Sequence, residues 1–330
     1  MEVCGSCGAP LHGGNLACPA CNWLVHGERL KQLAAEAQEQ ETRGEPGEAL
    51  ARWREALEIL PPQSAQHRKI TERTERLSQA IAAPTVTLRP QKPAWVKRFG
   101  PFGGAALLLW KLKFVLVAVL SKAKLLLLGL TKISTLLSMV VSFGAYWALF
   151  GWRFGLGLVG SIYVHEMGHV AAMRRFGMPA SAPMFIPGFG AFVRLQAHPT
   201  TPVEDARIGL AGPLWGLGGT IVTFAIGTWL RSPIWLAIAH TAAWINLFNL
   251  LPVWQLDGGR AFAAVAKLGR VLVATVYLAV WAYTREGLLV LLAIVAYARA
   301  LEKNGPTTSD RTTIVQLTAL AVLLGLLAVR

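Results

Sequence analysis

The chain has 330 residues, of which 54% are hydrophobic and only 15% are charged. This composition excludes an ordinary soluble domain and indicates an integral membrane protein. The net charge of +14 does not indicate nucleic-acid binding, because residues 1–80 hold 9 basic and 11 acidic side chains and the basic excess lies in the apolar part. Since no apolar signal peptide opens the chain, we expect a cytosolic N-terminus and, in a prokaryote, a multi-pass protein of the cell membrane.

The first 26 residues contain all the cysteines, arranged as two pairs with two residues between the members of each pair. The pairs are Cys4 with Cys7 and Cys18 with Cys21. Four thiolates in this pattern suit a tetrahedral structural zinc ion. A pair of disulfides is the alternative, which a cytosolic location disfavours. Residues 1–26 are therefore predicted to be a zinc ribbon.

Residues 27–80 are polar and helical in pattern. Gly44, Trp53 and Pro61 fall at the spacing of a tetratricopeptide repeat, but a plain helical hairpin packed by a third helix at 66–79 fits equally well. Either structure indicates an adaptor that binds a cytosolic protein partner. Prolines and glycines in residues 81–104 predict a linker. We therefore expect residues 1–80 to be tethered to the apolar part of the chain rather than packed against it.

The remainder of the chain is dominated by apolar runs. Residues 105–132 carry five lysines and are predicted to form basic interfacial helices, with a true span as the alternative. Longer runs in the predicted transmembrane domain, residues 133–330, indicate an all-α polytopic protein with about six to seven spans in the lipid bilayer. These runs lie near 133–151, 153–175, 205–230, 234–252, 268–284, 286–302 and 312–329.

One of these runs contains the pattern His165-Glu166-Met167-Gly168-His169. Ionisable residues are costly inside a membrane, so such a cluster indicates a functional site. Residues four apart lie about 40° apart around a helix, so both imidazoles can reach one metal ion. Glu166 lies near the same face and can hold and deprotonate a water molecule.

Asp257 is the best candidate for a third metal ligand. Few carboxylates follow Glu166, and most of them lie at expected helix ends, whereas Asp257 follows a continuous apolar run. The expected topology places Asp257 and the histidine motif toward the same side of the membrane. Three protein ligands would leave a fourth coordination position for water, as is typical of catalytic zinc.

The two motifs together resemble the site-2 protease family of intramembrane zinc metalloproteases. The second motif consists of Asn249, Pro252 and Leu256-Asp257-Gly258. Gly212-Pro213 also resembles a family motif, although Trp215-Gly216 replaces the asparagine often found a few positions later. The resemblance implies that His165, His169 and Asp257 bind zinc, that Glu166 activates water, and that the substrate is another membrane protein.

Two segments near these motifs are further candidates. Residues 182–195 predict a β-hairpin that presents an unpaired edge to an unwound substrate, with an ordinary loop as the alternative. Asn249 either stabilises an oxyanion or caps the helix before Pro252. His198 and His240 are expected to be packing residues, and glycines 212, 216, 218 and 219 to be close helix contacts.

The sequence thus predicts a zinc-dependent intramembrane endopeptidase with one catalytic and one structural zinc ion. An alternative is an inactive membrane zinc-binding scaffold that acts through its cytosolic adaptor. A metal transporter is less favoured, because the acidic residues concentrate at one depth instead of continuing across several spans.

Overall fold

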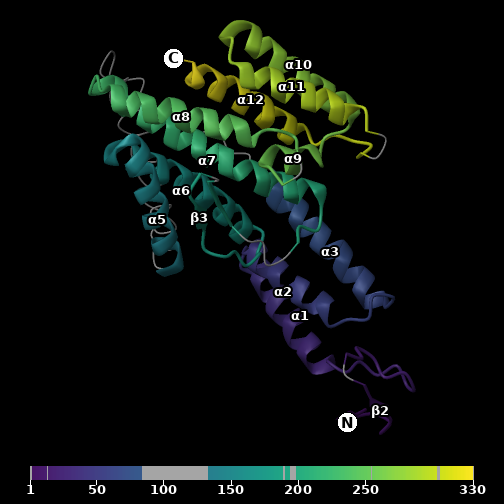
Figure 1. Ribbon diagram of the computed structural model, residues 1–330. Coiled ribbons are helices and arrows are strands. Elements are labelled where there is room, and N and C mark those ends of the chain that lie inside the picture. Colours follow the sequence, from purple (N-terminus) through teal and green to yellow (C-terminus); the bar gives the residue numbers. More distant parts are fainter. Residues whose placement is uncertain are drawn as a thin grey trace, which may run out of the picture.

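The computed structural model describes residues 2–12, 14–83, 133–188, 190–193, 198–253, 255–302 and 305–329. Most of the predicted linker and all of the predicted interfacial helices, residues 105–132, lie outside the described residues. Figure 1 shows the helices that follow residue 132 gathered in one body, with the N-terminal helices projecting from one end of it.

The helices of this body coincide with the apolar runs of the sequence to within a few residues. They are α5 (Ile133–Phe150), α6 (Trp152–Arg175), α7 (Pro202–Trp229), α8 (Pro233–Asn249), α9 (Asp257–Phe262), α10 (Lys267–Thr284), α11 (Gly287–Ala300) and α12 (Arg311–Ala328). A two-stranded antiparallel sheet, β3 (Met184–Ile186) with β4 (Gly190–Phe192), lies between α6 and α7 in the chain. The protein is therefore mostly helical with a short hairpin.

Three helices of the described residues are long and apolar enough to cross a membrane, namely α5, α7 and α12. The predicted count of six to seven spans is therefore not reached by length and composition alone. Helix α6 has 24 residues, but its histidines and glutamate lower its mean hydropathy. Helices α8 and α11 are shorter, with 17 and 14 residues.

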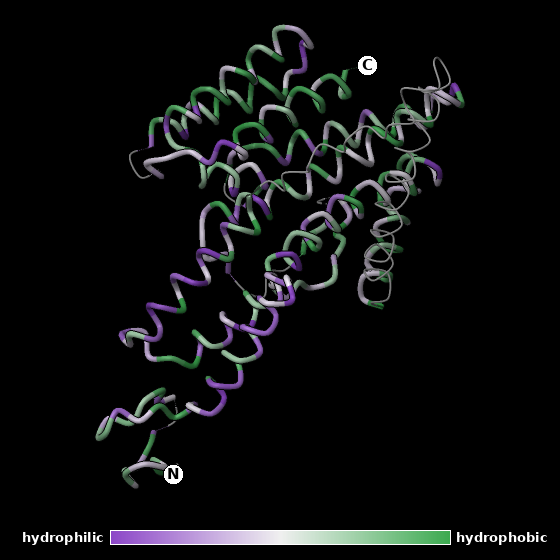
Figure 2. The backbone as a smooth tube through the Cα atoms, turned by 180° about the vertical axis from the view of Figure 1, so that it is seen from behind, coloured by the Kyte–Doolittle hydropathy of each residue, from purple (hydrophilic) through white to green (hydrophobic). Residues whose placement is uncertain are grey.

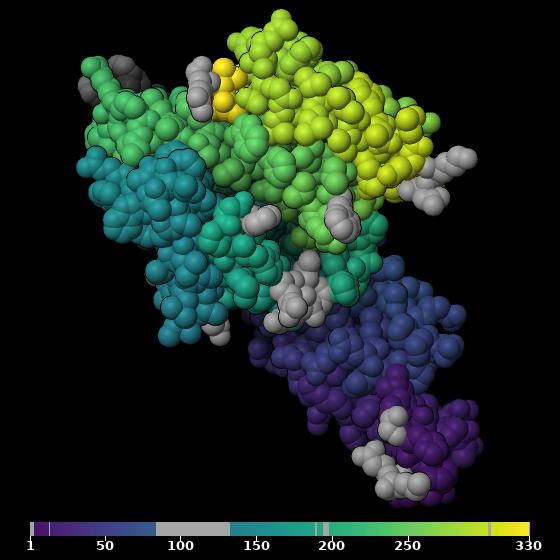
Figure 3. All heavy atoms as spheres, in the orientation of Figure 1, coloured from purple at the N-terminus to yellow at the C-terminus, as the bar shows by residue number. Residues whose placement is uncertain are grey.

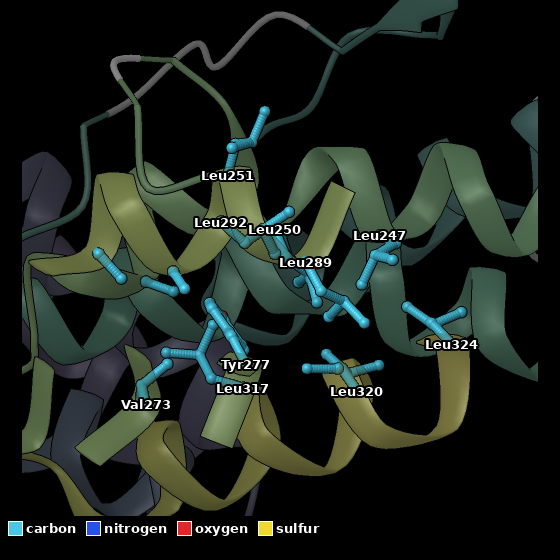
Figure 4. Packing of buried hydrophobic residues seen from close by; sticks show 14 of the residues in the cluster. Leu247, Leu250, Leu251, Val273, Tyr277, Leu289, Leu292, Leu317, Leu320 and Leu324 are labelled. Atoms are coloured by element: carbon cyan, nitrogen blue, oxygen red, sulfur yellow. The ribbon is translucent and has the colours of Figure 1, made fainter. Parts of the chain in front are cut away.

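A core of apolar side chains joins α8 to the C-terminal helices. Leu247 of α8, Tyr277 of α10, Leu289 of α11 and Leu320 of α12 are each at most 1% exposed, and Figure 4 shows them within one packed cluster. Close packing of these side chains holds the helices together. This core fixes α8, which lines the candidate site described below.

The N-terminal part begins with a small hairpin, β1 (Glu2–Val3) and β2 (Pro10–Leu11), followed by α1 (Gly27–Thr42), α2 (Pro46–Glu58) and α3 (Ala65–Ala82). The helices are largely hydrophilic, in contrast to the body (Figure 2). Glu41 of α1 accepts hydrogen bonds from Trp53 Nε1 of α2 at 2.7 Å and Arg73 Nε of α3 at 2.8 Å. Although partial burial opposes ionisation, these donors lower the pKa of Glu41 below its ordinary value and tie the three helices together.

This helical adaptor, α1 to α3, packs directly against the body, contrary to the expectation of a merely tethered head (Figure 3). Gly47 of α2 and Gly177, which follows α6, allow the closest approach, because a Cβ at Gly177 would lie 2.0 Å from the Gly47 carbonyl oxygen. Glu204 in the first turn of α7 is fully buried and binds Arg54 of α2. Ser78 of α3 also donates to this carboxylate, at 3.1 Å. The contact thus contains a buried ion pair.

Replacing Arg54 by Ala should destabilise the protein by about 3–5 kcal/mol, because the buried Glu204 carboxylate loses its guanidinium partner. Thermal unfolding in detergent, together with protease cleavage between the adaptor and the body, measures the effect.

The matched control is Arg29→Ala, which breaks an ion pair with Glu55 in which the two side chains are 45% and 38% exposed. That variant should unfold almost like the unaltered protein, since exposed pairs contribute little. Equal behaviour of the two variants would contradict a structural role for the Arg54–Glu204 pair.

Candidate active site

Helix α6 carries the first part of the candidate site in a buried segment, since all residues from 165 to 170 are buried. The four-residue spacing places the His165 and His169 rings one turn apart on one face. Their Nε2 atoms are 3.2 Å apart. The two imidazoles thus point at a common position.

Asp257 reaches the same position from the first residue of α9. Its Oδ2 atom lies 3.1 Å from His165 Nε2, and its Oδ1 atom lies 3.3 Å from His169 Nε2. The chain turns sharply to bring α9 there, since a Cβ at Gly258 would lie 2.0 Å from the Leu250 carbonyl oxygen. The structure therefore brings together the three residues that the sequence analysis selected as metal ligands.

The hydrogen-bond partners of the two rings define which ring nitrogen carries the proton. His169 Nδ1 lies 2.8 Å from the Ile208 carbonyl oxygen, which can only accept. His165 Nδ1 lies 2.8 Å from Asn246 Oδ1. Both Nδ1 atoms therefore donate, and in neutral rings both Nε2 atoms are left with a lone pair.

Two Nε2 lone pairs and a carboxylate thus converge with no proton between them, an arrangement that a cation stabilises. Ligands bound to zinc at about 2.0–2.1 Å in a tetrahedral site are roughly 3.3 Å from one another. The separation of 3.2 Å between the two Nε2 atoms fits this geometry, and each Nε2 atom lies at a similar distance, 3.1 or 3.3 Å, from one oxygen of the Asp257 carboxylate. The donor set suits zinc, with one coordination position left open.

Helix α7 closes one side of the candidate metal position. A Cβ at Gly212 would lie 2.3 Å from His169 Nε2 and 2.7 Å from His165 Nε2. Any larger residue at position 212 would enter the space of the ligand atoms. The glycine is therefore required by the site itself as well as by helix packing.

A cavity of about 380 Å³ opens beside the histidines. Its lining includes Glu166 and Asn249, together with Gly190 and Ala191 of β4. Glu166 is 6% exposed and is separate from the three converging groups. The cavity thus holds a carboxylate, an amide and a strand edge next to the candidate metal position.

The hairpin borders this cavity with residues of β4. Phe185 of β3 donates its backbone N–H to Ser138 Oγ of α5 at 3.2 Å, so this N–H points away from β4. Because Phe185 is paired with Ala191, the N–H and C=O of Ala191 point away from β3 in turn. Ala191 lines the cavity. The predicted hairpin is present, and the backbone groups of Ala191 that point away from β3 lie at the cavity.

Asn246 is the site residue that the sequence analysis missed. It is 2% exposed, and it binds His165 although it precedes the motif asparagine by three positions. A buried asparagine in an apolar helix is the signal that could have identified it. The other histidines lie apart: His198 is exposed, and His240 Nδ1 lies 2.7 Å from the Leu327 carbonyl oxygen.

The four cysteines of the N-terminal hairpin form a second cluster. None is in a disulfide, and Cys4 Sγ lies 3.7 Å from Cys21 Sγ while Cys7 Sγ lies 3.6 Å from Cys18 Sγ. Zinc–sulfur bonds of about 2.3 Å place tetrahedral ligands roughly 3.8 Å apart. The cluster therefore fits a zinc site, as a zinc ribbon requires.

Comparison with known proteins agrees with this chemistry. Residues 153–232 match the profile of Peptidase family M50. The matched segment contains His165, Glu166 and His169 and ends before Asp257.

Several proteins are similar to about a third of this chain. Rip3 of Mycobacterium tuberculosis, which is named as a zinc metalloprotease, is 33% identical over 134 residues, covering 37% of this chain and 34% of Rip3. Stage IV sporulation protein FB of Bacillus subtilis is 27% identical, covering 30% of this chain and 35% of that protein. Zinc metalloprotease MJ0392 of Methanocaldococcus jannaschii is 28% identical, covering 32% of each chain.

The chain thus spans only about a third of the length of these relatives. No solved structure matches it significantly. Because the segment that matches Peptidase family M50, residues 153–232, contains the histidine motif, the resemblance to the site-2 protease family is confirmed over that segment.

Proposed function

We propose that this protein is a zinc-dependent endopeptidase that cleaves another membrane protein within or near its span. The observation that carries the proposal is the convergence of His165, His169 and Asp257 beside a cavity that also contains Glu166. The similar proteins named as zinc metalloproteases support the same chemistry.

His165, His169 and Asp257 would hold the zinc ion, which, when bound, supplies Lewis-acid activation of water and of the substrate carbonyl. Glu166 accepts a proton from the attacking water as the water oxygen bonds to the carbonyl carbon. Glu166 then returns this proton to the departing amide nitrogen when the C–N bond breaks. Its position in the cavity wall, outside the ligand set, leaves the carboxylate free for this role.

Asn249 is the proposed donor to the oxyanion. It is the last residue of α8, and its side chain lines the same cavity as Glu166. An amide N–H aimed at the carbonyl oxygen would stabilise the negative charge that develops there. The C-cap residue of α8 is Leu250, whose backbone N–H donates to the carbonyl oxygens of Leu247 and Phe248.

The substrate would bind as an extended strand along β4. Peptide bonds inside an intact helix are poorly exposed to attack, whereas the backbone groups of Ala191 at the cavity can pair with an unwound segment. Non-helical backbone at membrane depth is tolerable where it lines such a cavity. The three apolar helices long enough to cross a membrane support a membrane-embedded substrate.

The N-terminal residues would bind a second, structural zinc ion and act as a cytosolic adaptor for a protein partner. We propose the division into a ribbon at 1–26, an adaptor at 27–80, a linker at 81–104, interfacial helices at 105–132 and a multi-pass protease domain at 133–330. The N-terminus would be cytosolic. An inactive zinc scaffold is the alternative function, and it would lack the products described next.

Replacing Glu166 by Gln should abolish cleavage while both zinc ions remain bound, because an amide cannot accept the proton from water. Mass spectrometry of membrane-protein fragments from cells that carry either form measures this difference and identifies the substrate. Glu58→Gln, at an exposed position of the adaptor, is the matched control and should give the fragments of the unaltered protein. Identical fragments from all three forms would contradict the role of Glu166.

Replacing Asn249 by Ala should lower kcat by about 100- to 1000-fold, the usual cost of removing one oxyanion donor. The measurement uses purified protein in detergent with the substrate identified above. The zinc content should stay unchanged, since Asn249 contacts none of the ligand atoms in the described hydrogen bonds. Unchanged kcat would leave Asn249 with only a structural role.

Metal analysis of the purified chain should find two zinc ions. Replacing Asp257 by Ala should remove one of them, because the remaining imidazoles bind zinc weakly without the carboxylate. Replacing Cys18 by Ser should remove the other. Two zinc ions in the Asp257 variant would eliminate this residue from the ligand set.

A further inference from the structure

We propose that Asn246 of α8 is a positioning residue, which fixes the tautomer and orientation of His165 for the metal. Gly216 of α7 is the position that makes room for it. This inference rests on the proposed zinc site, and it adds two residues that act on the site without binding zinc.

The amide of Asn246 is held at both ends. Its Nδ2 atom donates to the Ala242 carbonyl oxygen at 2.8 Å, which can only accept, so Oδ1 is the atom that faces His165. Oδ1 lies 2.8 Å from His165 Nδ1 and accepts the proton on that nitrogen. His165 Nε2 therefore keeps the lone pair that a metal ion requires.

Gly216 is required by the position of this amide. A Cβ at residue 216 would lie 1.9 Å from Asn246 Oδ1 and 2.5 Å from its Cγ. Distances this short are excluded, so even alanine would displace the amide from His165. The support of the His165 ring therefore involves three helices: α6 carries the ring, Gly216 of α7 leaves the space, and α8 carries the Asn246 amide.

The two histidines differ in how they are supported. His169 donates to a backbone carbonyl, that of Ile208, which no substitution removes. His165 depends on a single side chain that is 2% exposed. Loss of this side chain would let the His165 ring rotate or take the other tautomer, with a proton on Nε2. The effect should thus appear in metal binding as well as in catalysis.

The test is a zinc competition experiment on the full-length chain with a chelator. Replacing Asn246 by Leu, which keeps a similar volume but removes the acceptor, should release the zinc ion held by His165, His169 and Asp257 at about 10- to 100-fold lower chelator concentration, the usual effect of removing such a partner. Replacing Asn246 by Asp, which keeps an acceptor for Nδ1, should restore most of the affinity. The zinc of the cysteine cluster serves as an internal reference.

Gly216 allows a second, independent test. Replacing Gly216 by Ala should weaken zinc binding by itself, but it should add little when Asn246 is already Ala, because the displaced amide is then absent. Thr220→Val is the matched control. Thr220 is 1% exposed and donates to the Gly216 carbonyl oxygen at 2.8 Å, and its hydroxyl is not bonded to His165. This variant should bind zinc normally.

The outcomes separate this inference from the proposed function. If Asp257→Ala lowers the zinc content while Asn246→Leu keeps the affinity of the unaltered protein, the site stands and the positioning role is wrong. Additive losses for Gly216→Ala and Asn246→Ala would likewise overturn the pairing of these residues. If the unaltered protein and Asp257→Ala bind the same amount of zinc, the metal site itself is wrong.

Discussion

The central constraint on this structure is that three hydrogen-bond acceptors, from His165, His169 and Asp257, lie close together in a buried site. The Nε2 atoms of His165 and His169 and the carboxylate of Asp257 lie 3.1–3.3 Å apart. When both rings are neutral, their Nδ1 atoms carry the protons and no proton lies between these groups. Such an arrangement is unfavourable unless a cation joins the groups. Helix periodicity alone places the two histidines on one face of α6, whereas the Asp257 carboxylate reaches them only because the chain turns before α9.

Small residues on α6 and α7 serve this arrangement. A Cβ at Gly168 would lie 2.3 Å from the Ala211 carbonyl oxygen, and Gly212 and Gly216 face the histidines and Asn246 in the same way. Glycines at helix contacts in membranes are usually explained by close backbone packing alone. Here two of them also provide space for site side chains. Among the described residues, by contrast, none lies within 4 Å of a Cβ at Gly218, so the predicted close contact is not found there within that part of the chain.

The sequence predicted those parts of the structure that follow from local periodicity. The apolar runs locate the helices, and the few carboxylates after Glu166 single out Asp257. An asparagine in an apolar helix could have marked Asn246 as a candidate, but its contact with His165 could not be predicted, because that contact depends on how α8 is rotated against α6, and no local pattern determines that rotation. In the sequence, Trp215-Gly216 replaces the asparagine that the family motif often has on this helix. In the structure, the amide beside His165 is that of Asn246 on the neighbouring helix α8.

The docking of the adaptor escaped prediction for a related reason. Glu204 and Asp205 belong to the carboxylates that were expected at helix ends, and they lie in the first turn of α7. Glu204 binds Arg54 of the adaptor, while Asp205 binds Arg260 of α9, the helix that begins with Asp257. One turn of α7 therefore contacts the adaptor on one side and the segment carrying a candidate ligand on the other. Through these two contacts of α7, the adaptor and the candidate site are parts of one packed unit. Small shifts of the adaptor can therefore be transmitted to the site through α7.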